Sequence, residues 1–370
     1  MPPNLEAGRE PASVALVLEP AGESQRRLGG LPVGLRLALD AQAAGASCVV
    51  VAPGASELRA ALVDPRLRIP VLESAPPGSA RLRVGIDWLV HRATFKELMA
   101  ELAPGDERDV RRVTEPPGVA YAFAPIELDS DQAASRAERA LFRSLRKPQD
   151  GLTSRHLNRY ISLFFSRLLV KTPLRPNQVS VGILGIGIGG AVSAAQGGYW
   201  PLVLGATLFQ AQSVLDGCDG EMSRVSHRGS RLGEWLDTIG DDLTNYGFFG
   251  GAGLGLYRST GHQLYAIAGI VCVACGVIAS GIEYRYLIKI GSGDLLKYPL
   301  SQATNSAKGL YGIALQLTKR DTFVLLTLLA ALGGALGPML CIFSLGAIGV
   351  LISVLKTELR MAREARAARG

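Results

Sequence analysis

Hydrophobic and polar residues are distributed differently in the two halves of the chain, and the pattern changes near residue 178. Before that point, short apolar runs alternate with polar stretches. SVALVL (13–18) and CVVVAPG (48–54) resemble buried strands, and GLRLALDAQAAGA (34–46) between them has helical spacing. A strand, a helix and a strand in this order form the βαβ unit of a parallel sheet, so the first half predicts an α/β domain.

Further segments extend this domain before the pattern changes. Strands are predicted at 67–72, 81–87 and 119–126, and a helix is predicted at 93–102. Residues 130–147 alternate in charge at helical spacing, which is typical of a solvated linker helix. We therefore expect a cytosolic α/β domain with Rossmann-like layers over 1–130, followed by a linker helix over 131–150.

Long apolar stretches dominate the second half. Six of them are predicted to cross a membrane as helices, at about 179–197, 200–219, 233–257, 262–284, 322–335 and 338–355. All but the short fifth approach the ~20 residues that a ~30 Å hydrocarbon core requires. The prediction for 176–370 is therefore an all-α polytopic membrane domain of six transmembrane helices.

The segment 151–171 is amphipathic and carries several arginines away from its apolar side. Such a helix is expected to lie in the membrane interface, so we assign 151–175 to an interfacial amphipathic helix. A soluble helix packed on the N-terminal domain is the alternative.

The distribution of charge predicts which membrane the protein occupies and how it is oriented there. The formal net charge is +7, and the basic residues stand beside the apolar spans. This placement favours an anionic membrane face or phosphorylated substrates as partners, and not nucleic acid. The turns at 198–200 and 334–337 carry no charge, whereas the 285–320 loop and the tail are basic. The positive-inside rule then predicts a protein of the inner (cytoplasmic) cell membrane with both termini in the cytoplasm.

Four aspartates stand out because they lie inside the apolar half. Asp216 and Asp219 are three residues apart, and Asp237 and Asp241 are four apart, so each pair shares one face of a helix. Unpaired carboxylates near a membrane would repel one another at high cost. Divalent cations would relieve this repulsion, and oxygen-only ligands favour Mg²⁺, Mn²⁺ or Ca²⁺ over zinc. Surface charge at helix ends is the alternative.

Three residues between the aspartate pairs complete a recognisable pattern. They are Gly220, Arg224 and Gly233, and together they give D-x2-D-G-x2-S-R-x8-G-x3-D-x3-D. This pattern resembles the signature of the CDP-alcohol phosphotransferase family, with Ser223 in place of the usual alanine. The resemblance covers about residues 155–370. For Arg224, a purely topological role as an inside-positive residue is the alternative.

The resemblance implies an enzyme that moves a phospho-alcohol group from a CDP-alcohol to an acceptor hydroxyl and releases CMP. By the same resemblance, Asp216, Asp219 and Asp237 are metal ligands in a two-metal Mg²⁺ or Mn²⁺ site. Asp241 would complete that site and act as the catalytic base. The cytidine nucleotide would contact the residues Gly220, Arg224 and Gly233. Members of the family are often dimers, so a homodimer is an expected assembly.

The N-terminal domain resembles a sugar-nucleotide-type nucleotidyltransferase. Gly22, Arg26 and Pro32 match that family's loop, but Val33 stands where a lysine is usual. The glycine-rich core is reduced to Gly22-Glu23-Ser24, which puts an acid beside the phosphates. We expect a degenerate relative without catalysis. Asp87 could stand in for the family's metal-binding aspartate, and a strand-end cap is its alternative role.

The fusion itself resembles enzymes that join an inositol-phosphate cytidylyltransferase to a transferase making phosphorylated di-inositol compounds. An inositol phosphate or another polyol phosphate is therefore the favoured acceptor. The alternatives are a CDP-diacylglycerol-dependent phosphatidyltransferase of phospholipid synthesis and, from another class, a cation-coupled transporter. A catalytically dead scaffold is a third alternative.

Overall fold

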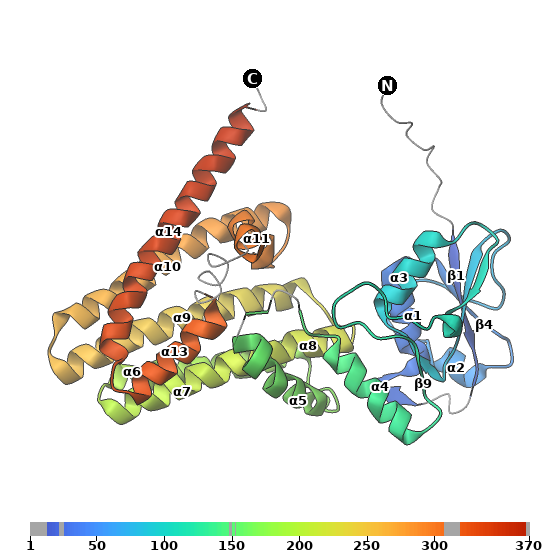
Figure 1. The fold of residues 1–370 in the computed structure, drawn as a ribbon, viewed down its shortest axis with the longest axis horizontal. Coiled ribbons are helices and arrows are strands. Elements are labelled where there is room, and N and C mark those ends of the chain that lie inside the picture. The colour runs from blue at the N-terminus through green and yellow to red at the C-terminus, as the bar shows by residue number, and fades with distance from the viewer. Residues whose placement is uncertain (1–12, 22–25, 148–149, 152, 307–318, 368–370) are drawn as a thin grey trace. The chain divides into compact units, whose positions relative to one another are not determined.

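Two compact units make up the chain in a computed structural model (Figure 1). One unit contains residues 1–148 and 224–228, and the other contains 149–223 and 229–370. The structure describes residues 13–21, 26–147, 150–151, 153–306 and 319–367.

The first unit is built on a five-stranded sheet with the order β5-β4-β1-β6-β8. Its strands are β1 (Val14–Glu19), β4 (Cys48–Val51), β5 (Val71–Leu72), β6 (Ala80–Gly85) and β8 (Glu107–Asp109). All neighbouring strands run parallel, with β1 between β4 and β6. The helices are α1 (Val33–Ala44), α2 (Ser56–Ala61), α3 (Arg92–Glu101), the 3₁₀ turn η1 (Val110–Arg112) and α4 (Asp131–Arg143). The predicted parallel α/β sheet is confirmed.

Two small ribbons accompany this sheet: β2 (Arg27–Leu28) pairs with β3 (Leu31–Pro32), and β7 (Trp88–Leu89) pairs with β9 (Ile126–Glu127). Helix α4 forms within the segment predicted as a linker helix. It buries four apolar residues of its inner face, namely Ala133, Ala137, Leu141 and Phe142. The turn 224–228 also belongs to this unit, and there the Nη1 of Arg66 donates to the carbonyl O of Ser226 at 2.6 Å.

The strand predicted over 119–126 is wrong, because only its last residue enters β9. Tyr121 has a φ of 63°, in the left-handed region, which breaks an extended chain. Pro125 has no N–H to donate to a ladder. The strand predicted at 67–72 shortens to β5 for a related reason. Pro70 can only accept a ladder bond, which it does from the N–H of Val49 at 2.9 Å.

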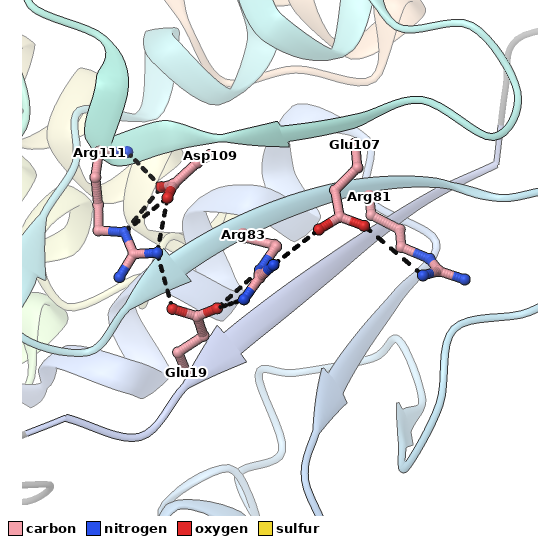
Figure 2. A network of polar contacts seen from close by, with 6 residues as sticks. All are labelled: Glu19, Arg81, Arg83, Glu107, Asp109 and Arg111. Carbon is pink, nitrogen blue, oxygen red and sulfur yellow. Dashed lines mark hydrogen bonds and ion pairs between the residues drawn. The ribbon is translucent and has the colours of Figure 1, made fainter.

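One face of the sheet carries a network of ion pairs (Figure 2). Arg83 on β6 donates to Glu19 on β1 at 2.7 Å and to Glu107 on β8 at 3.0 Å. Arg111 donates to Asp109 at 2.7 Å, and its Nη2 lies 2.9 Å from a carboxylate oxygen of Glu19. The alternate residues of β1 and β6 point to the other face and are fully buried, including Leu16, Leu18, Leu82 and Val84. One face of these strands is therefore apolar, and the other combines the ion pairs with a small apolar cluster of Ala15, Cys48 and Val50.

Acidification below about pH 4 is expected to weaken this unit through Asp109. Hydrogen bonds from Arg111 hold the pKa of the Asp109 carboxyl below its ordinary value. A carboxyl with a lowered folded pKa stabilises the fold above its unfolded pKa, and this stability is lost as the pH falls through the folded value. For a pair near the surface, the loss should be about 0.5–1 kcal/mol.

Hydrogen exchange of the β1 and β6 amides, corrected for intrinsic rates, would measure this opening free energy. In Asp109→Asn, the opening free energy should fall less at low pH than in the wild type. Glu115→Gln, a change at an exposed position of the same unit, should leave this decrease unchanged. The same decrease at low pH in Asp109→Asn as in the wild type would contradict the prediction.

The second unit is helical. Its elements are the π-helical turn η2 (Ser154–Asn158), α5 (Arg159–Leu169), α6 (Pro176–Gln196), α7 (Tyr199–Leu215), α8 (Gly217–Val225, which ends inside the 224–228 turn), α9 (Arg231–Thr260), α10 (Gln263–Ile290), the 3₁₀ turn η3 (Leu295–Lys297), α11 (Pro299–Ser306), α13 (Arg320–Leu332) and α14 (Leu336–Ala367). Its core surrounds Phe209, Phe248 and Phe249, and the first two rings stack with centroids 4.5 Å apart.

Each of the six predicted spans overlaps a helix of this unit, and the second runs past the end of α7 into α8. The helices differ in how well they fit a bilayer. By length and composition, α6, α10 and α14 could cross a membrane, among the residues that the structure describes. Helices α7 and α13 have only 17 and 13 residues. Helix α9 has 30 residues but carries several acids in its first half. A helical membrane domain is therefore confirmed, and the number of six spans stays a prediction.

Helix α5 has its polar face turned inward. Its buried residues are Arg159, Ser162, Leu163 and Ser166. Its large apolar side chains are exposed instead, at 37–58% for Tyr160, Ile161, Phe164, Phe165 and Leu168. An exposed apolar face is what a helix lying in a membrane interface requires.

Glycines allow the closest helix crossings in the second unit. A Cβ on Gly255 of α9 would collide with the carbonyl O of Ala194 on α6 and would lie 2.9 Å from the N of Gly197. Backbone atoms cannot move aside as a flexible side chain can. We therefore expect Gly255→Ala to lower the free energy of unfolding by about 1–3 kcal/mol through overpacking.

The matched control for this change is Gly185→Ala on α6, where an added Cβ meets nothing within 4 Å. That substitution should be neutral or stabilising, because alanine favours a helix over glycine by about 1 kcal/mol. Thermal unfolding in detergent compares the two variants. Equal melting temperatures would show that the α6–α9 crossing tolerates a methyl group.

Candidate active site

The four motif aspartates come from two neighbouring places in the second unit. Asp216 caps the end of α7, and Asp219 lies in the first turn of α8. Asp237 and Asp241 lie one turn apart in the first half of α9. The sequence placed each pair on one helical face, and the structure pairs one aspartate of each, Asp216 and Asp241, with the same cation.

That cation is Arg320, the first residue of α13. Its Nη1 lies 2.6 Å from Oδ1 of Asp241 and 3.5 Å from Oδ2 of Asp216. In the sequence, Arg320 is one basic residue at the end of the 285–320 loop, and nothing there predicts its place among the acids.

Polar groups from α7 and α9 hold the rest of this guanidinium. Nη2 of Arg320 donates to Oε1 of Gln212 at 2.6 Å and to the hydroxyl of Thr244 at 3.3 Å, and Nε donates to Oδ1 of Asn245 at 3.1 Å. Gln212 and Thr244 are 2% and 1% exposed. Asn245 lies one helical turn after Asp241 on α9, so both side chains lie on the same face.

Asp219 has hydrogen-bond partners of its own. Asp219 accepts a short hydrogen bond from the hydroxyl of Ser180 on α6 and another from the N–H of Gly220. Asp219 is 8% exposed, whereas Asp237 is an exposed residue. The convergence of the four carboxylates on shared ions therefore stays a prediction.

The donors nonetheless have the chemistry of a divalent-cation site. Within the part of the chain that the structure describes, no three acidic, histidine or cysteine side chains are grouped closely enough to hold a metal ion. However, Oδ1 of Asp241 is buried and has no hydrogen-bond partner, because its contact with Arg320 is an ion pair without hydrogen-bond geometry. Carboxylate oxygens in this situation suit Mg²⁺ or Mn²⁺ after small side-chain rotations.

The predicted nucleotide-contacting residues flank the aspartates. Gly220 follows Asp219, Arg224 lies in the last turn of α8, and Gly233 lies in the first turn of α9. The N–H of Gly233 donates to the Ser230 hydroxyl at 3.0 Å. A Cβ at Gly233 would lie 3.1 Å from Oδ1 of Asn177, which is a tight contact. Glycine therefore keeps this helix start close to the first turn of α6.

A buried ion pair fixes α8 beside the aspartates. Glu221 is fully buried and accepts from Nη1 of Arg159 at 2.7 Å. It also accepts from the hydroxyls of Ser162 at 2.9 Å and Ser166 at 2.6 Å, both on α5. Arg159 in turn grips both carboxylate oxygens of Asp150 at 2.8 Å. The polar inner face of α5 therefore binds Glu221, which lies two residues after Asp219.

In the first unit, the nucleotidyltransferase-like features are only partly described. Gly22-Glu23-Ser24 lies outside the described residues. Arg26 donates to the carbonyl O of Ser130 at 3.2 Å, next to the start of α4. Asp87 follows β6, and its Oδ1 is buried without a hydrogen-bond partner among the described residues. Either a metal ligand or a strand-end residue is compatible with that position.

Comparison with protein families identifies the second half of the chain. The family model of CDP-alcohol phosphatidyltransferases matches residues 174–355. These residues are a CDP-alcohol phosphatidyltransferase domain. The family resemblance seen in the aspartate motif is thereby confirmed, and the protein is an integral membrane protein with helical spans. The α/β unit precedes this domain in the chain.

Several curated proteins resemble parts of the chain. A bifunctional IPC transferase and DIPP synthase of Thermococcus kodakarensis is 34% identical over 161 residues, which is 43% of this chain and 35% of that protein. The protein of the same name from Rubrobacter xylanophilus is 36% identical over 158 residues, 41% of this chain and 35% of that protein. The chain thus spans about a third of the length of these relatives.

A phosphatidylinositol phosphate synthase of Corynebacterium glutamicum is 26% identical over 121 residues, 32% of this chain and 54% of that protein. Among solved structures, a phosphatidylinositol phosphate synthase of Mycobacterium tuberculosis with CDP-DAG bound gives a TM-score of 0.41 at 18% identity. The matched region covers 54% of this chain and 93% of that chain.

Proposed function

We propose that the protein is a membrane-embedded, metal-dependent CDP-alcohol phosphotransferase. It would move a phospho-alcohol group from a CDP-alcohol to an acceptor hydroxyl and release CMP. The observation that carries the proposal is the pairing of Asp216 and Asp241, from two different helices, with one cation inside a domain of this family. A group of carboxylates that needs compensating positive charge suits a reaction on a pyrophosphate, where cations are required.

We assign Asp216, Asp219, Asp237 and Asp241 to hold Mg²⁺ or Mn²⁺. When bound, the metal neutralises the pyrophosphate and stabilises the charge on the departing CMP. Asp219 would leave Ser180 by a side-chain rotation. Gly220, Arg224 and Gly233 would contact the nucleotide, since glycine admits the ligand close to the backbone and arginine binds phosphate oxygens in pairs.

Asp241 would act as the general base. The acceptor's hydroxyl oxygen forms a bond to the phosphorus that carries the alcohol, and its proton passes to Asp241. The bond from that phosphorus to the bridging oxygen breaks, and CMP leaves with the electron pair. Asp241 suits this role because it is the motif aspartate farthest along α9 and its Oδ1 is buried without a hydrogen bond.

For the acceptor, we propose an inositol phosphate or a related polyol phosphate. The supporting observation is that relatives named as IPC transferases and DIPP synthases reach 34–36% identity over about two-fifths of this chain. A lipid donor such as CDP-diacylglycerol is the second candidate, and it is favoured by the similarity to a protein named as a phosphatidylinositol phosphate synthase.

We further propose that α6, α7, α9, α10, α13 and α14 all cross the inner membrane, with both termini in the cytoplasm. The basic residues at one set of helix ends support this orientation. The exposed apolar face of α5 supports its place in the interface. The proposed organisation is a nucleotidyltransferase-like domain over 1–130, a linker helix over 131–150, an interfacial helix over 151–175 and the transferase domain over 176–370, assembled as a homodimer.

The test is CMP release by purified protein with Mg²⁺ or Mn²⁺. CDP-inositol and CDP-diacylglycerol would be offered as donors, each with inositol phosphate and glycerol phosphate as acceptors. CMP that appears only with a matched donor, acceptor and metal supports the proposal, and the productive donor decides between the two candidates. No CMP from any pair would overturn it. Pyrophosphate release from CTP and inositol phosphate would overturn the expectation that the N-terminal domain is inactive.

A further inference from the structure

The aspartate cluster contains the guanidinium of Arg320, and neutral polar side chains hold this cation in place. Arg320 makes ion pairs with Asp241 and Asp216 through Nη1 alone. Its remaining donors, Nη2 and Nε, bind three neutral acceptors, which are Gln212, Thr244 and Asn245. The guanidinium is thus anchored on one edge by neutral groups and offers its other edge to the carboxylates.

The sequence spacing explains why neutral acceptors lie next to the carboxylates. Gln212 lies four residues before Asp216 on α7, and Asn245 lies four residues after Asp241 on α9. One helical turn therefore separates each neutral acceptor from a carboxylate on the same face. The two helices present a neutral polar layer next to an acidic layer, and Arg320 bridges both.

The backbone at Arg320 is held independently of these contacts. The next residue, Asp321, accepts from the N–H of Ser154 at 2.6 Å, and the hydroxyl of Thr322 lies 3.3 Å from that of Thr153. The start of α13 is therefore tied to the turn before α5. A change in the contacts of Arg320 then needs only a rotation of its side chain.

Resting on the proposed metal-dependent function, we propose that Arg320 is the built-in counter-ion of this site. It neutralises Asp241 and Asp216 while no metal is bound, and it competes with the divalent cation for them. On metal binding, Nη1 gives up the carboxylates while Nη2 and Nε keep Gln212 and Asn245. The site is thus protected from the repulsion of its own acids, at the expense of weaker metal binding.

The competition makes a prediction opposite to that of a merely structural arginine. Arg320→Gln removes the competing charge, so the affinity for Mn²⁺, measured by the electron paramagnetic resonance of free Mn²⁺, should rise by about tenfold or more. In EDTA the same variant should melt at a lower temperature than the wild type, and saturating Mn²⁺ should restore most of the difference. A structural role predicts weaker Mn²⁺ binding, because the site would lose its order.

Two further variants serve as comparisons. Arg320→Lys keeps the positive charge but loses the planar guanidinium with its several N–H donors. Its Mn²⁺ affinity should therefore stay within about threefold of the wild type. Arg360→Gln, at an exposed residue of α14 that pairs with Glu364, should change neither Mn²⁺ affinity nor melting. If Arg320→Gln does not fold even with Mn²⁺, the lysine variant decides, and a change beyond tenfold in its Mn²⁺ affinity overturns the proposal.

Unchanged or weaker Mn²⁺ binding in folded Arg320→Gln also overturns the counter-ion role. CMP release by the wild type is measured separately. If it succeeds while Arg320→Gln binds Mn²⁺ no more tightly, only the counter-ion proposal fails. If Mn²⁺ binds and responds as expected but no CMP forms from any pair, the proposed reaction fails and the counter-ion role stands. A wild type that binds no Mn²⁺ overturns both.

Discussion

Replacing Asp241 by asparagine is expected to reduce CMP release by about a thousandfold or more. Asparagine keeps the size of the side chain but removes both the negative charge for the metal and the site for the acceptor's proton. Asp237→Asn should remove a metal ligand without touching the base, so it should raise the Mn²⁺ concentration needed for half-maximal rate as well as lowering the rate. Steady-state CMP release at varied Mn²⁺ measures both effects.

The chain offers a matched control in the adjacent residue. Asp242 also lies in α9, but it accepts a hydrogen bond from the hydroxyl of Tyr284 at 2.6 Å instead of contacting Arg320. Asp242→Asn should therefore change the rate by less than about tenfold, the loss expected from a displaced neighbouring contact. Equal losses in Asp241→Asn and Asp242→Asn would show that Asp241 has no special part in the reaction.

Breaking the buried pair between Arg159 and Glu221 is expected to cost about 3–5 kcal/mol of the free energy of unfolding. In Arg159→Met, Glu221 would keep only two hydroxyl donors and a full charge with no water around it. Reversible unfolding by SDS in mixed micelles measures the loss. The large expected size comes from the desolvated charge that is left behind, and not from the strength of the pair itself.

Two comparisons separate this explanation from lost packing. Arg159→Met combined with Glu221→Gln should recover the part of the loss that comes from Glu221, because its charge is then no longer left buried, whereas Asp150 still loses its contacts with Arg159. Arg360→Met breaks an exposed pair with Glu364 and should cost less than about 1 kcal/mol. If the double variant is as unstable as Arg159→Met, the charge explanation is wrong.

The aspartates of the site were predictable because their spacing in the sequence is the spacing of a helix. Periods of three and four residues place side chains on one face whatever the tertiary structure. Helices α7 and α9 each have a strong apolar pattern around these acids, so a polar face there was informative. The family signature added the glycines and Arg224, whose contacts with a nucleotide remain predictions.

Arg320 could not be found in this way. It is separated from Asp241 by most of α9, all of α10 and the 285–320 loop, and only the tertiary packing brings the two together. Among many basic residues at helix ends, nothing local distinguishes it from a topological signal. The partner of Asp219 was missed for the same reason, because a serine on α6 carries no chemical signature.

In the α/β unit, hydrophobic runs predicted the central strands and failed at the edges. Strands β1, β4 and β6 are buried, so their apolar residues form unbroken or alternating runs. The 119–126 run is equally apolar, but a proline and a left-handed tyrosine prevent its pairing. Strand β8 was not predicted, because its sequence ERD carries ion pairs in place of apolar residues.

Helix α14 has 32 residues, so it is about 48 Å long at 1.5 Å per residue. A bilayer core of about 30 Å takes up some 20 of these residues. The remaining turns, which Figure 1 shows extending past the other helices of the unit, carry the charged residues Glu358, Arg360, Arg363, Glu364 and Arg366. In the proposed topology, such an arm is long enough to reach through the headgroup layer into water, and its length would let this one helix tilt in membranes of different thickness.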